Sequence, residues 1–154
     1  MAFAMESNPV LAFAEWLAET PDSWPDAARE AAHHAFIDVI AVSVPGAQDP
    51  ATERVFATVK DWGAGPATVF GMGTGLAAPW AALVNGTAAH ALDFDDNFDP
   101  AKAHATAVLV PAILALAGQQ GASGAACIDA YIAGLQIMGR AGQGVNPTHR
   151  NRGW

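Results

Sequence analysis

The stretch AAPWAALVNGTAAHAL, residues 77–92, and the stretch HATAVLVPAILALAGQ, residues 104–119, decide the fold of this chain. The first is rich in alanine, which has the highest helix propensity and lets helix axes approach closely. With Trp80 and Leu83 in it, this stretch predicts a deeply packed helix. The second stretch is almost wholly apolar, as is typical of a buried central helix. The polar residues 93–103 between them predict a connecting loop.

Further helices are indicated by capping residues, by proline in a first turn and by acids near a helix start. Their predicted starts are Pro9, residues 23–26, Pro50 and Gly124, and the last three end near residues 44, 63 and 140. Between residues 63 and 75 glycine recurs and only residues 67–70 favour a strand. We therefore expect one small extended excursion there and no sheet core. The predicted fold class is all-α, a single helical bundle.

The charge of the chain limits its partners. The net charge of −8 argues against nucleic acid, because phosphate binding requires clustered Lys and Arg. Charged residues make up 14% of the chain, against a usual figure of about 25%, so another subunit or further chain is expected to cover much of the surface. Residues 101–154 carry a balance of +3, which would place an anionic ligand in that part of the chain. An uneven charge distribution of this kind also arises by chance, when the sequence covers only part of a protein whose surface has mixed charge.

Cysteine usage and hydropathy predict a cytoplasmic protein without a membrane segment. The single cysteine, Cys127, cannot form an internal disulfide and falls in an apolar helical stretch, which indicates a core residue in a reducing compartment. The first six residues contain no Lys or Arg, unlike the basic start of a signal peptide. The longest uncharged apolar run, residues 105–117, contains Pro111 and is shorter than the roughly 20 residues that span a bilayer.

The loop between the two apolar helices holds an unusual concentration of polar groups. Within residues 90–104 there are four carboxylates, one lysine and two histidines. Loops held by a rigid scaffold often carry catalytic groups, although an aspartate-rich turn can also be a solvated connection. The polar side chains concerned are His90, Asp93, Asp95, Asp96, Asn97, Asp99, Lys102 and His104.

Two metal-binding interpretations of this loop are weak. Its alternating acids match an EF-hand, but Phe98 stands at the position of the turn glycine and His104 at that of the bidentate glutamate. Residues 95–99 match the magnesium–diphosphate motif of helical isoprenoid synthases, which require a second acidic motif that this sequence lacks. We therefore predict no metal ion.

Acid–base chemistry is the third interpretation. A histidine exchanges protons near neutral pH, and a neighbouring carboxylate can orient it or act as a base. Asp93 ends one predicted helix and His104 begins the next, so folding of the loop could bring them to opposite sides of one pocket. Exposed amides at the start of the second helix, together with Lys102, would suit a substrate carboxylate.

The run NGTAAHALDFDD, residues 85–96, resembles the signature of the MmgE/PrpD family, which includes 2-methylcitrate dehydratase, cis-aconitate decarboxylase and iminodisuccinate epimerase. The resemblance covers nearly the whole chain in order. It continues through residues 102–111, 121–124, 139–140, 146–147 and 152–154.

This resemblance implies a fold in which a large helical domain is joined to a smaller α/β lid domain, usually as a homodimer. Members are about three times as long as this chain, so residues 1–154 correspond to the N-terminal part of the helical domain, without the lid. By position, Asp93 and His104 match the catalytic aspartate and histidine of the family. Asn97 stands where some members have a site threonine, and Lys102 lies in the same substrate loop, so both are candidates for substrate binding.

The activity implied by the resemblance is proton transfer at a carbon next to a carboxylate, without metal or organic cofactor. The expected substrate is a small di- or tricarboxylate, and the first expectation is a lyase of the 2-methylcitrate dehydratase type. Asp99 stands where some members have histidine, and its spacing to His104 is one residue longer than in cis-aconitate decarboxylase, which argues against that activity. The alternatives are an epimerase of a dicarboxylate such as iminodisuccinate, and an inactive helical remnant that only dimerises or binds a partner.

Overall fold

The computed structural model describes residues 8–20 and 23–153 of the chain. The first six residues, on which the expectation about a signal peptide rests, and Trp154 lie outside this described part. The elements within it, in chain order, are α1 (Pro9–Glu19), α2 (Asp26–Gly46), α3 (Pro50–Val59), β1 (Ala64–Val69), β2 (Thr74–Leu76), α4 (Ala78–His90), α5 (Ala105–Gln120), α6 (Gly124–Val145) and α7 (Thr148–Asn151).

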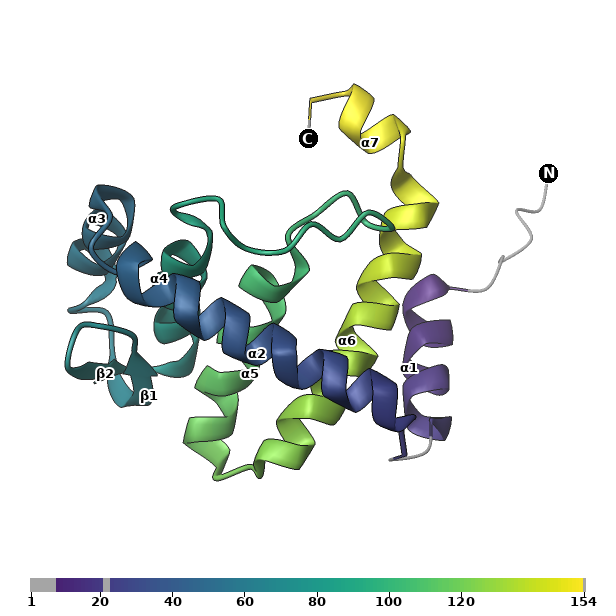
Figure 1. Cartoon of the computed structure of the whole chain (residues 1–154), viewed down its shortest axis with the longest axis horizontal. Coiled ribbons are helices and arrows are strands. Elements are labelled where there is room, and N and C mark those ends of the chain that lie inside the picture. The colour runs from purple at the N-terminus through teal and green to yellow at the C-terminus, as the bar shows by residue number, and fades with distance from the viewer. Residues whose placement is uncertain (1–7, 21–22, 154) are drawn as a thin grey trace.

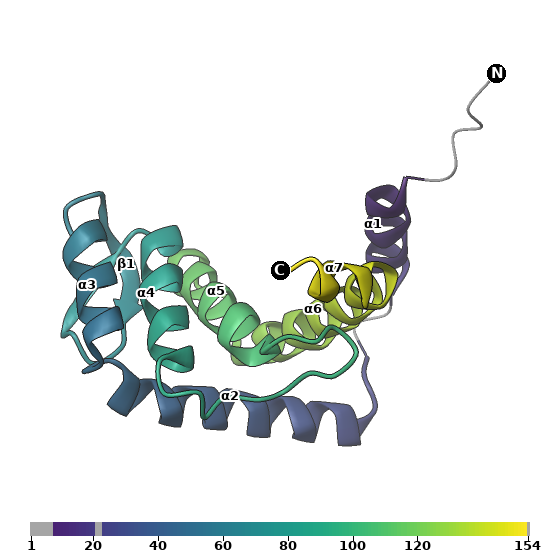
Figure 2. The same cartoon turned by 90° about the horizontal axis from the view of Figure 1, so that it is seen from above.

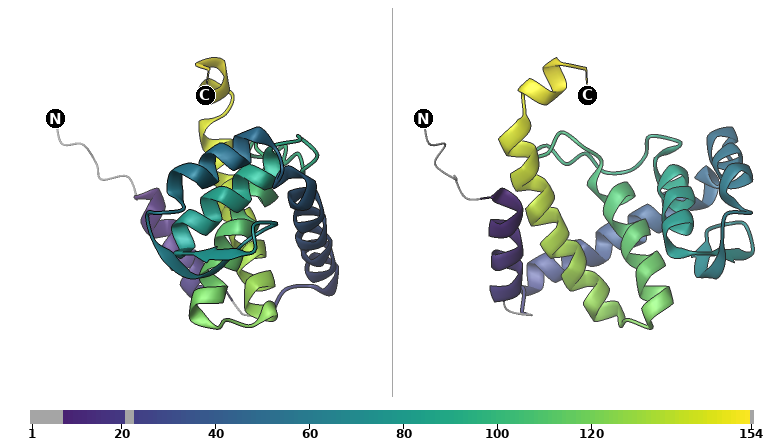
Figure 3. Two further views of the ribbon diagram at one scale, coloured as in Figure 1. Left: turned by 90° about the vertical axis from the view of Figure 1, so that its left-hand side faces the viewer. Right: turned by 180° about the vertical axis from the view of Figure 1, so that it is seen from behind.

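The helices form an arc that the long helix α2 crosses (Figures 1 and 2). Helix α3 and the two strands lie at one end of the arc, α4, α5 and α6 follow along it, and α1 lies beside α6 at the other end. Figure 3 shows α7 projecting beyond the body of the molecule at the end of α6. The connection between α4 and α5, residues 91–104, runs along the helices as a long loop, and we call it the acidic loop.

Two clusters of buried side chains hold these elements together. The first joins α2, α4, α5 and α6, and its buried members are Ala32, Val39, Ala89, Ala107, Val110, Ile128, Tyr131 and Ile132. The second joins α3, both strands, α4 and α5, through Val59, Ala67, Val69, Leu76, Ala78, Ala81, Val84 and Ala115. Because α4 and α5 contribute to both clusters, these two helices lie at the centre of the fold.

The fold is mostly helical, but the prediction of an all-α protein is wrong in one detail. Strands β1 and β2 pair antiparallel, with Thr68 opposite Gly75. The buried side chain of Asn85 in α4 fixes this hairpin, accepting from the amide of Phe70 and donating to the carbonyl of Thr68, both at 2.8 Å. Strand β2 could not be predicted from the sequence, because its three residues include Gly75 and lie among further glycines.

Helix α2 includes Pro45 and Gly46, which were predicted to stop it. Proline removes one helical hydrogen bond, but the amide of Ala47 still donates to the carbonyl of Ser43 at 2.8 Å, so the last turn closes. Gly46 allows α2 to approach α4 closely. A Cβ at this position would lie 1.9 Å from the carbonyl oxygen of Ala88.

Helix α6 continues to Val145, beyond its predicted end near residue 140. The glycines in its last turns are poor helix formers, but Gly142 packs against the acidic loop so closely that a Cβ there would lie 2.3 Å from the Cα of Ala101. Packing therefore overrides local propensity in this segment.

One side of the central helices is open. Helix α4 was predicted to be deeply packed and α5 to be buried, yet Leu83 of α4 is 48% exposed, and Val108 and Leu116 of α5 are also exposed. Cys127 is buried in α6, as predicted for a core residue, and burial raises the pKa of its thiol. None of the described helices combines the length and hydropathy needed to cross a membrane.

Candidate active site

The acidic loop is fixed to the start of α5 by Asp96. Its carboxylate accepts from the amide of Thr106 at 2.8 Å and also from the Thr106 hydroxyl. His104 is the N-cap residue of α5, but its side chain makes no capping hydrogen bond, so Asp96 supplies the cap from a distant point of the chain. The prediction that the exposed amides of this helix start would bind a substrate carboxylate is therefore wrong for the Thr106 amide, which already has a carboxylate partner.

Tyr131 of α6 lies close to this cap. It is buried in the first core cluster and packs edge-on against Phe36. Burial, and secondarily the negative charge of Asp96, raises the pKa of Tyr131 to about 12. Its hydroxyl therefore stays protonated at neutral pH.

The structure brings the two predicted catalytic residues together. His104 Nε2 lies 3.9 Å from Asp93 Oδ1. This distance exceeds that of a hydrogen bond, so the two groups face each other without a direct bond. The Asp93 side chain is 78% exposed, and its backbone has a positive φ of 56° at the point where the chain leaves α4.

Two residues that were not assigned a role complete this cluster. The side chain of Asp95 is fully buried and lies between two imidazoles. Its Oδ1 is 3.0 Å from His90 Nδ1, and its Oδ2 is 3.4 Å from His104 Nδ1. The second contact lacks hydrogen-bond geometry, although the nitrogen is buried. The rings of His90 and His104 are 4.5 Å apart between centroids.

The cluster of His90, Asp93, Asp95 and His104 lies beside an apolar groove. The groove has a volume of about 750 Å³ and is lined by His90 and Asp93 at the end of α4, together with apolar residues such as Leu83 and Val108. A small molecule could therefore approach both ionisable side chains from one side of the α4–α5 pair.

The same cluster could hold a divalent cation. Each of its four members offers one nitrogen or oxygen atom, and these atoms lie within 4.8 Å of one another. Imidazole and carboxylate ligands suit Zn²⁺ and related ions. The sequence-based prediction of no metal and no cofactor stays a prediction.

Asn97 and Lys102, the predicted substrate-binding residues, lie in a different place from Asp93 and His104. They line a polar groove of about 430 Å³ between the acidic loop and the start of α7, with Asn146, His149 and Arg150 on its other side. Lys102 Nζ donates to Asp99 Oδ1 at 2.7 Å. This hydrogen bond, and then the charge of Lys102, lowers the pKa of the Asp99 carboxyl.

The polar groove is shaped by close packing of the acidic loop on α6. The side chain of Asn146 donates to the carbonyl of Ala101 at 3.0 Å. Gly139 and Gly142 leave room for Phe98 and Ala101 against the helix, because a Cβ at either glycine would press on the loop. The acidic loop is thereby held at two points, by α5 through Asp96 and by α6 through Phe98 and Ala101.

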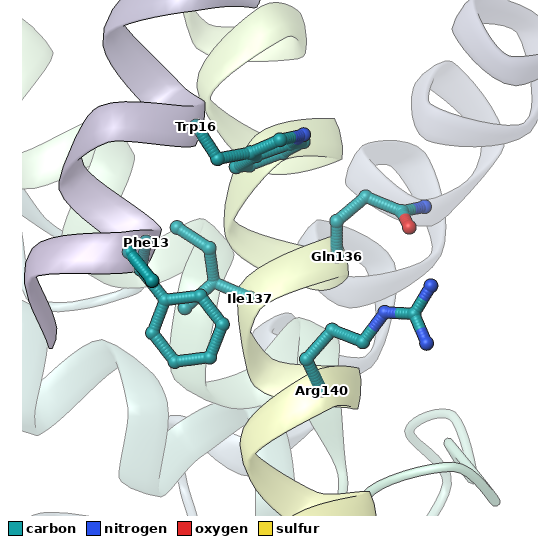
Figure 4. A pocket seen from close by; sticks show the side chains of 6 residues that line it. Phe13, Trp16, Gln136, Ile137 and Arg140 are labelled. Carbon is teal, nitrogen blue, oxygen red and sulfur yellow. The ribbon is translucent and has the colours of Figure 1, made fainter. Parts of the chain in front are cut away.

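A further groove of about 390 Å³ lies between α1 and α6, away from these residues (Figure 4). Phe13, Trp16 and Ile137 form its apolar part, and Gln136 and Arg140 extend from α6 beside it. Trp16 is 38% exposed, so it lines this groove and is not a core residue.

The comparisons with known proteins agree with the resemblance in the loop. A family model described as the MmgE/PrpD N-terminal domain matches residues 11–154. A curated relative, the cis-aconitate decarboxylase-like protein oryM of Aspergillus oryzae, is 27% identical over 159 residues, which cover 97% of this chain and 33% of that protein. The chain thus spans about a third of the length of the curated relative that it matches.

Proposed function

The chain belongs to the MmgE/PrpD family, and from that premise we propose that its natural polypeptide is a cofactor-independent lyase. The proposed reaction is the elimination of water from a small di- or tricarboxylate, as in 2-methylcitrate dehydratase. The observation that carries this proposal is the approach of His104 Nε2 to within 3.9 Å of Asp93 Oδ1 beside an open groove.

The proposed chemistry uses each of these groups once. Asp93 accepts the proton from the carbon next to a substrate carboxylate, and the electrons of that C–H bond form the new C=C bond. The hydroxyl on the adjacent carbon leaves with its bonding electrons and takes a proton from the His104 imidazolium, which gives water. Proton return from Asp93 to His104 restores both groups, and their separation is short enough for one water molecule to relay this proton.

Substrate carboxylates need cationic or amide partners, and Lys102 and Asn97 are our candidates, although they line the polar groove and not the apolar groove beside Asp93. They lie on the acidic loop between Asp93 and His104 in sequence, in a groove that also contains Arg150. The balance of +3 in residues 101–154 supports an anionic ligand on this side of the molecule. We further propose that the natural polypeptide is a homodimer, which would cover part of the apolar surface that α4 and α5 leave exposed.

The experiment is to measure the turnover of 2-methylcitrate by the natural polypeptide that carries this domain, and by its His104→Ala variant. General acid–base catalysis contributes about 10²–10⁴-fold in rate, so the variant should lose that much kcat. The control is His34→Ala, which removes an exposed histidine from α2. Undiminished turnover in the His104 variant would rule out its role.

Decarboxylation is a second candidate. Asp99 and its spacing to His104 argue against it, but the relative of Aspergillus oryzae is named as cis-aconitate decarboxylase-like. In that reaction the C–CO₂ bond breaks and the carbon takes a proton, which His104 could supply. Release of CO₂ from cis-aconitate distinguishes this activity from loss of water. Proton exchange without either product would indicate an epimerase, and no reaction in the natural polypeptide would favour a protein that only dimerises or binds a partner.

A further inference from the structure

We infer that Asp95 is a positioning residue for two imidazoles, and that His90 is a second proton-transfer group of the site beside His104. This inference rests on the proposed function and extends it, because the family resemblance assigned a catalytic role only to Asp93 and His104. It is carried by the burial of Asp95 between the two Nδ1 atoms.

The partners of Asp95 follow from its burial. A fully buried carboxylate is costly unless its charge is compensated by hydrogen bonds or an opposite charge. The polar side-chain atoms found near its oxygens in the described residues are His90 Nδ1, at 3.0 and 3.2 Å, and His104 Nδ1, at 3.4 Å. An Nδ1–H group of His90, the ring that has hydrogen-bond geometry to Asp95, would compensate the carboxylate.

This hydrogen bond selects one tautomer of His90. When Nδ1 carries the hydrogen, the neutral imidazole keeps a lone pair on Nε2, which can then accept a proton. A buried aspartate holds the catalytic histidine of serine-protease triads in the same way, fixing its tautomer and stabilising the imidazolium. Asp95 does this for His90 directly, and a small movement of His104, whose buried Nδ1 lacks a hydrogen-bond partner, extends it to the second ring.

The two Nε2 atoms would then serve one site. That of His104 faces Asp93 at 3.9 Å, and the His90 side chain is about half exposed and lines the apolar groove that Asp93 also lines. The two ring centroids are 4.5 Å apart, so a substrate beside Asp93 would lie close to both imidazoles. His104 can hold the proton for the leaving group, while His90 accepts the proton that Asp93 has taken from the carbon and returns it to His104.

The first test measures the tautomers by ¹⁵N NMR of the imidazole nitrogens at constant pH. We expect His90 to be an Nδ1–H tautomer in the native protein and to lose this preference in Asp95→Asn, whose side chain can present an N–H group in place of an acceptor. An unchanged His90 tautomer in this variant would overturn the positioning role. Because this NMR measurement does not require turnover, its result does not depend on whether the proposed lyase activity is correct.

The second test separates a structural role of His90 from a chemical one. His90→Asn keeps a nitrogen donor near the position of Nδ1 and removes Nε2, so the bond to Asp95 can persist while proton transfer cannot. We expect the His104 NMR signals to stay close to native and kcat to fall about 10²-fold or more, with a smaller change in KM. The matched control is His33→Asn, an exposed histidine of α2.

Several outcomes would overturn the inference. Native kcat in His90→Asn would remove His90 from proton transfer, even if His104→Ala is inactive as the proposed function requires. Stoichiometric Zn²⁺ binding that is required for activity and abolished by Asp95→Asn would show that the four side chains are metal ligands instead. If Asp95→Asn does not fold, the NMR measurement on His90→Asn and on the native protein decides between these cases.

Discussion

Gly142 in α6 supports the acidic loop, and its replacement by alanine tests how the loop is held. The added Cβ would lie 2.3 Å from Ala101 Cα, 2.7 Å from Ala101 Cβ and 3.1 Å from the carbonyl oxygen of Pro100. Ordinary carbon contacts are about 3.5–4.0 Å, so the loop must move away by about 1 Å or more. Overpacking of this kind costs about 1–3 kcal/mol.

Helix propensity acts in the opposite direction and can be measured separately. Alanine is favoured over glycine inside a helix by up to about 1 kcal/mol. Gly144 lies two residues further along α6, and a Cβ there meets nothing within 4 Å. Gly144→Ala should therefore be neutral or stabilising, and the difference between the two variants isolates the packing cost of roughly 1–3 kcal/mol.

The assay is urea unfolding followed by circular dichroism, together with amide hydrogen exchange of residues 97–103. We expect Gly142→Ala to unfold at lower urea than Gly144→Ala and to exchange faster in the loop that carries Asn97 and Lys102. Equal stability of the two variants, with unchanged exchange in the loop, would refute the close packing of the loop on α6.

Three other predictions concern the supports of the site. Asn85→Ala leaves the Phe70 amide and the Thr68 carbonyl without their hydrogen-bond partner, which should lower the free energy of unfolding in urea by about 2–4 kcal/mol. The control is Thr87→Ala, which removes only a hydrogen bond to a carbonyl of its own helix. Asp96→Ala removes the cap of α5 and should cost about 1–2 kcal/mol by the same measurement; a change below about 0.3 kcal/mol would contradict this role. Tyr131 has a pKa of about 12 in the folded state against an ordinary value of 10, so its contribution to stability is present below pH 10 and is lost as the pH rises toward 12. The loss should reach roughly 2–3 kcal/mol and be absent in Tyr131→Phe, and absorbance titration of this single tyrosine would contradict the account if its phenol ionised near pH 10.

Local sequence signals predicted the helix starts better than the helix ends. Asn8, Asp49 and Ser123 each accept a hydrogen bond from an amide of the following turn, as their sequence context indicated. The ends of α2 and α6 were missed because they depend on packing partners distant in the chain, namely Ala88 for Gly46 and Ala101 for Gly142. A capping residue acts within a few positions, whereas these contacts form only in the folded molecule.

The same distinction applies to the candidate site. The sequence predicted the approach of His104 to Asp93, because both flank one loop between two apolar helices. It could not reveal that Asp95 is buried while Asp93 is exposed, since both are aspartates of one acidic run. From the sequence, Asn97 and Lys102 were predicted to bind the substrate at the same site as the catalytic pair. In the structure they line a separate groove between the acidic loop and the residues at the end of α6 and the start of α7. In a helix or strand the regular repeat predicts which side a residue faces. A loop has no such repeat, so the side that each of its residues faces cannot be predicted from the sequence.

The most direct test of our central claim is the exchange of substrate hydrogen with solvent deuterium, followed by NMR in D₂O with 2-methylcitrate and the natural polypeptide. We predict that deuterium enters the carbon next to a carboxylate in the native enzyme, and that both Asp93→Asn and His104→Ala slow this exchange by about 10²-fold or more. Exchange at the native rate in both variants would contradict the claim that this carboxylate and this imidazole move the proton.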